Sequence, residues 1–158
     1  MAGDGELVLT RSTDDRRRYD LAGVGSVRRE GLLGRSHELR PVVGRPLVAR
    51  QRGFLGRSTE AVDEAGVVVG TFTQRGLLRH GGPVVWNGLP HDLTSRSSWK
   101  NGYELARDGT PLLTVEARGW GRTPARIRVH DDRVDPGLVL FTVWLVQQFV
   151  QQDAAASS

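Results

Sequence analysis

The chain has 158 residues, of which 38% are hydrophobic and 25% charged, a balance typical of one globular domain rather than a disordered chain. It contains no cysteine, which excludes a disulfide framework and cysteine-ligated metal sites. The N-terminal stretch "MAGDGELVLTRSTDDRRR" lacks the apolar core of a signal peptide. We therefore expect a cytoplasmic protein.

The positive charge is concentrated in the first part of the chain. The net charge is +4, but residues 1–58 contain 12 basic against 7 acidic residues, and residues 59–158 contain 10 against 11. A basic half could attract the phosphates of a nucleic acid or an anionic membrane. Lys100 is the only lysine, so the excess could equally reflect a composition that uses arginine wherever a cation is needed.

Short segments with alternating or β-branched apolar residues recur between turn residues, which predicts an all-β chain of antiparallel strands. In the last of them, Ile127 and Val129 face one way and Arg126, Arg128 and His130 the other. The predicted strands are residues 6–11, 17–29 (a pair or one bent strand), 46–53, 66–76, 83–88, 110–119 and 125–131.

Turn residues support these strands. Asp108-Gly109, between "YELA" and "PLLTV", is a strong signal for a two-residue hairpin loop. The "EAG" at 64–66 predicts a second hairpin. Asn87-Gly88 and Asn101-Gly102 are candidates for turn positions with positive φ.

The C-terminal segment 135–152 predicts a helix of a different character. Asp135 is a plausible N-cap, and Pro136 fits the first helical position. From Leu138 to Val146 the segment is apolar on every side, which is typical of a helix in a membrane or in the centre of a core. The apolar stretch, residues 137–150, is shorter than the roughly 20 residues that span a bilayer. We therefore expect a buried central helix, an ordered core of about residues 5–151 within a single domain, and a frayed tail at 152–158.

Strand hairpins followed by one very hydrophobic helix form an unusual combination. Two segments, "WKNGYELARDGTPLLTVEARG" (99–119) and "DPGLVLFTVWLVQQFV" (135–150), resemble the tubby C-terminal-like superfamily, which includes the LURP-one-related proteins and the phospholipid scramblases. The stretch 66–86 is compatible with the middle of the same fold. The resemblance, closest to small bacterial members, implies a mainly β fold: a closed antiparallel β-barrel of about twelve strands around a central hydrophobic C-terminal α-helix. It also implies a basic surface that binds phosphoinositide headgroups, although no binding motif of that family aligns with this chain.

A short repeat stands out in the sequence. "REGLLGRS" at 29–36 returns as "RGFLGRS" at 52–58 and, more loosely, as "QRGLLRH" at 74–80, with Gly31, Gly53 and Gly76 spaced by 22 and 23 residues. "RGWGR" at 118–122 follows at about twice that spacing. A phosphate-binding P-loop would need a Gly-Lys-Ser/Thr ending, which is missing. We favour a recurring sheet corner, repeated once per two-strand unit, where glycine allows the bend.

Arginines two residues apart on a predicted strand are candidate anion ligands. Arg50 and Arg52 share one sheet face, as do Arg126 and Arg128. Two guanidinium groups on one face can bind a phosphate through paired hydrogen bonds. The alternative is a solvated outer barrel face, where alternate arginines are ordinary.

Tryptophans near predicted turns suggest a second type of contact. Trp99 with Lys100, and Trp120 with Arg122, could rest on a membrane surface if they lie exposed at the barrel rim. Packing in the core or rim is the alternative, and Trp144 belongs to the predicted core helix.

Catalytic and metal-binding patterns are weak. The four histidines, His37, His80, His91 and His130, show no metal-ligand spacing. Ser36 and Ser58 lack the context of a nucleophile elbow. We therefore predict no catalytic residue, no metal and no cofactor.

The leading hypothesis is a non-catalytic intracellular module that binds phospholipid headgroups or an anionic membrane surface, which would place it in the cytoplasm or at the inner membrane face. Nucleic-acid binding through the basic half, from Arg16 to Arg57, is the second hypothesis. An enzyme acting on a small substrate is the least favoured.

Overall fold

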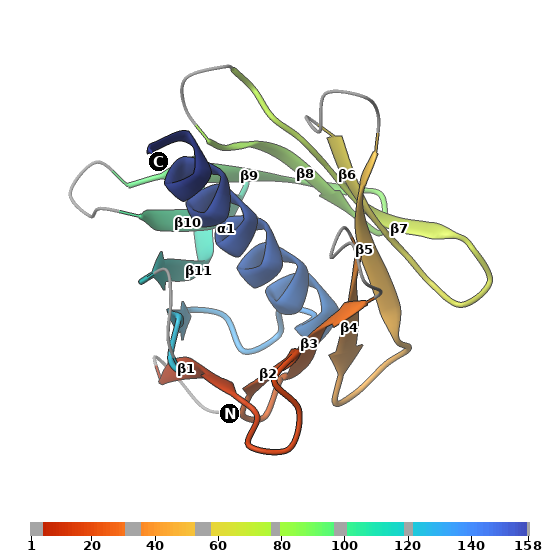
Figure 1. Ribbon diagram of the computed structural model, residues 1–158. Helices are drawn as coiled ribbons and strands as arrows, with labels where there is room; N and C mark the ends of the chain where they lie inside the picture. Colours follow the sequence, from red (N-terminus) through yellow and green to blue (C-terminus); the bar gives the residue numbers. More distant parts are fainter. Residues whose placement is uncertain are drawn as a thin grey trace.

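A computed structural model describes residues 5–30, 36–52, 58–76, 80–96, 101–118 and 122–157. These residues form a closed antiparallel barrel of twelve strands around one C-terminal helix (Figure 1). The fold class predicted from the sequence is therefore confirmed.

The barrel follows the chain. Each strand pairs with its sequence neighbours, and β12 closes the sheet by pairing with β1, where Leu7 lies opposite Ile127. Closure leaves no unpaired sheet edge. The strands are β1 (Glu6–Arg11), β2 (Arg18–Leu21), β3 (Gly25–Glu30), β4 (Ser36–Pro41), β5 (Leu47–Arg52), β6 (Ser58–Val62), β7 (Val68–Thr73), β8 (Gly82–Trp86), β9 (Leu89–Ser95), β10 (Gly102–Arg107), β11 (Thr110–Ala117) and β12 (Ala125–Val129).

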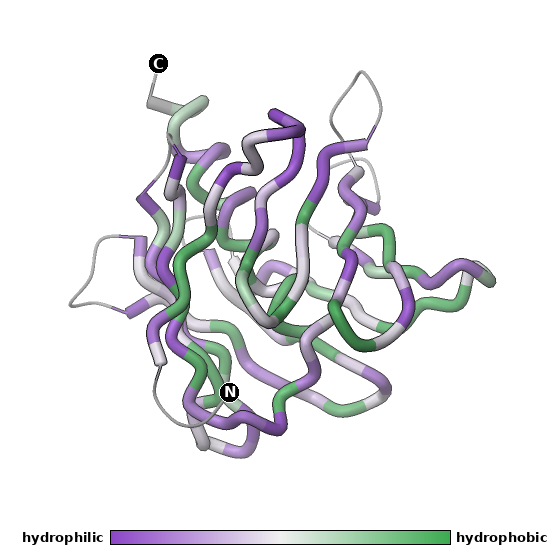
Figure 2. Tube along the Cα trace, turned by 90° about the horizontal axis from the view of Figure 1, so that it is seen from below, coloured by the Kyte–Doolittle hydropathy of each residue, from purple (hydrophilic) through white to green (hydrophobic). Residues whose placement is uncertain are grey.

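Alternation along the strands separates the inside of the barrel from the outside. In β12, Ala125, Ile127 and Val129 are buried, and the two arginines between them are exposed. The same change between apolar and polar residues is visible along several strands in Figure 2. Because side chains alternate with period two, this pattern fixes which residues can meet the central helix.

Helix α1 (Pro136–Ser157) fills the barrel. All residues from Leu138 to Val146 are buried, as expected of a helix that is apolar on every side. A barrel of this strand number is too wide for its own side chains to fill, so the helix supplies the missing core. The helix extends past the predicted end of the ordered core to Ser157, and residues 151–156 of this last part are exposed.

Most of the predicted turns are present. Asp108 and Gly109 have φ of 50° and 77°, and Asn87, Asn101 and Gly66 also have positive φ. Gly102, the first residue of β10, does not. The segment predicted at 17–29 is a pair of strands, β2 and β3. Sequence reasoning missed β4 and β9, which are polar and contain prolines, and recognised β6 only as the stretch before the "EAG" turn.

The glycine-rich repeats connect β3 to β4, β5 to β6 and β7 to β8, so their spacing does match a two-strand unit. Gly31, Gly53 and Gly119 lie outside the described residues. Gly76 is described, and neither of the usual needs for glycine applies there: its φ is not positive, and no atom lies within 4 Å of where a Cβ would be. For this copy of the repeat the predicted role of glycine as a bend is not supported.

Candidate anion-binding pocket

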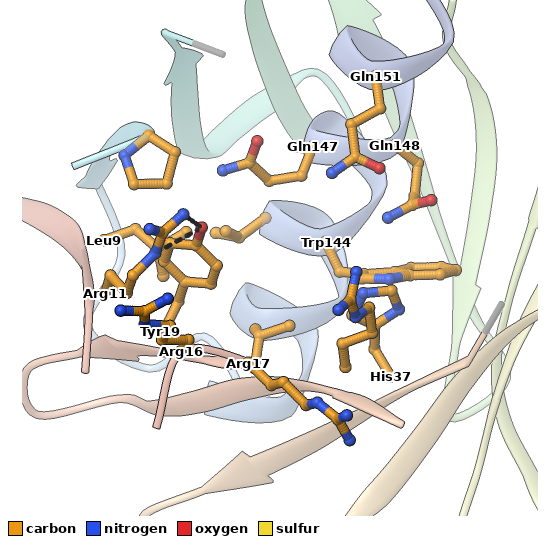
Figure 3. Close-up of a pocket in the computed structure, with 14 residues that line it drawn as sticks. Leu9, Arg11, Arg16, Arg17, Tyr19, His37, Trp144, Gln147, Gln148 and Gln151 are labelled. Carbon is orange, nitrogen blue, oxygen red and sulfur yellow. Dashed lines mark hydrogen bonds between the residues drawn. The ribbon is translucent and has the colours of Figure 1, made fainter. Parts of the chain in front are cut away.

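One end of the barrel contains a pocket of about 280 Å³ between α1 and strands β1 to β4 (Figure 3). It has two parts. The apolar floor consists of Leu9, Val27, Val143 and Trp144, all of them buried. The arginine rim consists of Arg11, Arg16, Arg17 and Arg29, which are half-buried or exposed.

Strand alternation brings the rim into the barrel mouth. Arg11 lies two residues beyond inward-facing Leu9, and Arg29 lies two residues beyond inward-facing Val27. Both arginines therefore follow the inward face of their strands to the end of the barrel. The register places Tyr19 opposite Arg11 and His37 opposite Arg29, so four adjacent strands converge on one opening.

The helix contributes the facing wall. Val143, Gln147 and Gln151 are four residues apart and lie on one stripe, with Trp144 and Gln148 beside them. Figure 3 shows Gln147 projecting from α1 toward the side of Arg11 and Tyr19, and Gln148 on the side of Trp144. Along this stripe the apolar Val143 is followed by Gln147 and Gln151, near the point where the helix leaves the barrel. Their side-chain amides give the pocket neutral hydrogen-bonding groups.

The rim carries positive charge without local compensation. None of the described residues that line the pocket is acidic. The guanidinium of Arg11 donates to the Tyr19 hydroxyl at 2.9 Å and lies over the Tyr19 ring. Among the described residues, Arg16, Arg17 and Arg29 form no ion pair with a carboxylate. Cations that converge on a concave, partly apolar surface focus a positive potential there.

The loop that presents two of these arginines is held in place by Asp15. One oxygen of Asp15 accepts a hydrogen bond from the Arg17 backbone N–H at 2.9 Å, and the other accepts from Arg28 Nε at 2.7 Å. These bonds lower the pKa of Asp15, with the Arg28 hydrogen bond as the largest cause. The backbone carbonyl of Arg17 in turn accepts the N–H of Arg29 at 3.0 Å. The backbone that presents Arg17 and Arg29 is therefore held by contacts within the protein.

His37 and Trp144 form the part of the pocket next to β4, with ring centroids 5.8 Å apart. Burial lowers the pKa of His37 to about 4, with the nearby Arg29 as a smaller cause. The imidazole is therefore neutral at physiological pH. His37 Nδ1 and Trp144 Nε1 are buried without a hydrogen-bond partner.

The arginine pairs predicted from the sequence lie elsewhere. Arg50 and Arg52 both approach Glu60, at 2.8 and 3.5 Å, and Glu60 is only 5% exposed. Arg126 and Arg128 both face Glu6, at 3.8 and 3.7 Å. The structure does not bring the two pairs together, because β1 to β4 separate β5 from β12 around the barrel. Each pair is on the outer face and shares one carboxylate.

The predicted membrane-contact residues are described only in part. Trp99, Lys100 and Trp120 lie outside the described residues. Arg122 is exposed, and its backbone carbonyl accepts the N–H of Arg11 at 2.8 Å. Arg122 therefore lies beside the pocket mouth.

The excess charge of the N-terminal half is thus unevenly placed. On the outer face, arginines of β2, β3 and β4 pair with neighbouring acids: Arg18 with Asp20, Arg28 with Asp15 and Arg40 with Glu38. Together with the pairs on β5, this leaves most of the uncompensated cations of the described N-terminal half at the pocket. Sequence reasoning missed the rim. A usable signal was present, because Arg11 and Arg29 each follow an apolar residue, Leu9 and Val27, by two positions and so share its face of the strand.

Neither a metal site nor a membrane-spanning helix is found in the part of the chain that the structure describes. It contains no group of three side chains arranged to hold a metal ion. The described helix does not reach the length and apolarity needed to cross a bilayer.

The fold and the pocket together define a helix-filled β-barrel with a positively charged opening at one end. Comparison of the chain with protein-family models, with curated proteins and with solved structures gave no match. What the chain does must therefore be argued from the pocket itself.

Proposed function

We propose that this protein is a non-catalytic binding module that holds an anionic ligand in the pocket at the barrel end, with anionic phospholipid as the physiological source. The observation that carries the proposal is the arginine rim: four guanidinium groups and, among the described lining residues, no carboxylate surround one opening. Arginine suits this role because its planar fork donates two parallel hydrogen bonds to a phosphate or carboxylate.

The pocket favours binding over catalysis. It contains no carboxylate, and its one histidine has a pKa of about 4, which makes the imidazole a weak base at neutral pH. The resemblance to the tubby C-terminal-like superfamily also favours a binding function. That resemblance implies a barrel around a hydrophobic helix, which is the architecture of this chain. It also suggests a phospholipid as the ligand, which would bring the protein to the inner membrane face for part of the time.

The distribution of charge favours a compact anion over a nucleic acid. Non-specific nucleic-acid binding requires a row of free cations that follows the phosphate backbone. Here the outer arginines of β2 to β5 face carboxylates, and most of the uncompensated arginines of the described N-terminal half surround a single small opening.

Sedimentation with vesicles tests the proposal. We expect the protein to sediment with phosphatidylglycerol vesicles and not with phosphatidylcholine vesicles, and to be released as the salt concentration rises. A gel-shift assay with double-stranded DNA runs in parallel. Binding to DNA without binding to anionic vesicles would replace this proposal with the nucleic-acid hypothesis. Binding to neither, by a folded protein, would refute phospholipid as the source and would also refute the nucleic-acid hypothesis.

A further inference from the structure

The two parts of the pocket differ in polarity along its depth. The apolar floor is formed by side chains that are at most 7% exposed, and the arginine rim lies at the mouth. A bare phosphate or carboxylate at the rim would leave the floor covered by water. A ligand that also carries hydrocarbon would remove apolar surface of both partners from water, which is favourable.

The same gradient sets the orientation of the ligand. Moving an anionic group down to the floor would strip its hydration among Leu9, Val27 and Val143, which offer no hydrogen bond in return. At the rim the anion stays partly hydrated and meets guanidinium groups. The favourable arrangement therefore has the apolar end inside and the charged end at the mouth.

The size of the pocket limits the apolar part. An apolar cavity of about 150 Å³ holds one benzene molecule. The whole pocket, rim included, is about 280 Å³ and therefore holds, in the same proportion, about eleven non-hydrogen atoms with the charged group counted among them.

We propose that the pocket binds a small amphipathic anion with its hydrocarbon on the apolar floor and its charged group at the arginine rim. The chemical class is a medium-chain or aromatic carboxylate or phosphate monoester, whether free in solution or drawn from a membrane. This inference rests on the proposed anion-binding function, and it adds the ligand's second half and its orientation.

Calorimetric titration with a matched set of ligands tests the ligand class. Octanoate is the main probe. Acetate and butyrate keep the charge and shorten the chain, whereas octanol and octylammonium keep the chain and change the charge. We expect octanoate to bind at one site per chain and about 100-fold more tightly than butyrate, because each added CH₂ contributes about three- to fourfold. Chains that bring the whole ligand above about eleven non-hydrogen atoms should gain no further affinity.

Two pairs of variants locate the site. Gln147→Trp should fill the pocket from the half-buried face of α1 and abolish octanoate binding, whereas Gln152→Trp, on exposed helix surface outside the pocket, should not.

Arg29→Gln should weaken octanoate binding at least about tenfold through loss of a charge-assisted hydrogen bond. Arg40→Gln, an exposed arginine of β4 outside the pocket, is its control. Circular dichroism and thermal unfolding establish that each variant is folded.

The outcomes separate this inference from the proposed function. If acetate, inorganic phosphate and octanoate bind equally, or if octanoate does not bind while anionic vesicles do, the amphipathic ligand is wrong and the anion-binding function stands. If octanol or octylammonium binds as well as octanoate, the rim has no role and the inference is wrong. Octanoate binding that depends on Gln147 and Arg29, without vesicle binding, supports the inference and identifies a free ligand as the source.

Discussion

Trp86 Nε1 donates a hydrogen bond to a carboxylate oxygen of Asp135 at 2.8 Å, at the end of the barrel opposite the pocket. The other oxygen of Asp135 accepts the backbone N–H of Gly137 at 3.0 Å, which confirms the predicted N-cap of α1. One carboxylate therefore ties the end of β8 to the start of the helix. This contact fixes the depth at which α1 enters the barrel and, through the helix, the position of the glutamines at the far end.

The double role of Asp135 predicts a large effect of a single substitution. Asp135→Ala should lower the free energy of unfolding by about 2 kcal/mol, because it removes a cap worth about 1 kcal/mol and the part-buried hydrogen bond from the indole N–H of Trp86, worth about 1 kcal/mol. Urea denaturation measures the effect. Asp132→Ala, at an exposed position of the preceding turn, should change stability by less than about 0.5 kcal/mol. Equal effects of the two substitutions would contradict this account.

Two glycines with different surroundings should respond differently to alanine. At Gly70 an added Cβ would lie 2.3 Å from Trp86 Cε3, whereas at Gly76 it would meet open space. Gly70→Ala should therefore cost about 1–3 kcal/mol through overpacking against the indole. Gly76→Ala should be neutral or slightly stabilising, because alanine restricts the unfolded chain. Thermal and urea unfolding compare the two, and a large loss at Gly76 would restore the structural role that the repeat first suggested.

Burial of His37 should make the protein less stable in mild acid. The pKa of His37 is lowered to about 4 from an ordinary 6.5. Above pH 6.5 the imidazole is neutral in both states and has no effect. As the pH falls from 6.5 toward 4, the unfolded chain gains a proton that the folded protein does not, so the free energy of unfolding falls, by at most about 3 kcal/mol.

The variant His37→Gln checks this prediction. It should reduce the loss of stability between pH 6.5 and 4, as measured by urea unfolding at several pH values. The exposed His130→Gln variant should retain the wild-type dependence. If His37→Gln and wild type lose stability in parallel, His37 is not the group responsible.

Much of the fold could be predicted because its signals are local. The apolar run from Leu138 to Val146 can only be a buried helix at this length, and Asp108-Gly109 fixes a hairpin by backbone conformation. Strands β4 and β9 gave no such signal. In β9, only His91 and Leu93 are buried, and Pro90 argues against a strand. Its place in the sheet comes from pairing with β8 and β10, which is tertiary information.

The site was less predictable, for a related reason. Sequence reasoning favoured arginines two residues apart, such as Arg50 and Arg52, because one strand is enough to place them together. Those arginines lie on the outer face near Glu60, a carboxylate from the neighbouring strand. The rim instead combines single arginines from β1, β3 and a loop. Their convergence depends on the closure of the barrel and on the register of α1 within it.

The most direct test of the central claim compares two double variants in one binding assay. Arg16→Gln/Arg29→Gln removes two cations of the rim, and Arg50→Gln/Arg52→Gln removes the same charge from the outer face. We expect the first variant to lose at least about tenfold in affinity for phosphatidylglycerol vesicles, because each lost guanidinium removes a charge-assisted hydrogen bond, and the second to bind within about twofold of wild type. Equal losses in both would show that net charge alone drives binding, and a loss confined to the second would place the site on the outer face and contradict the pocket.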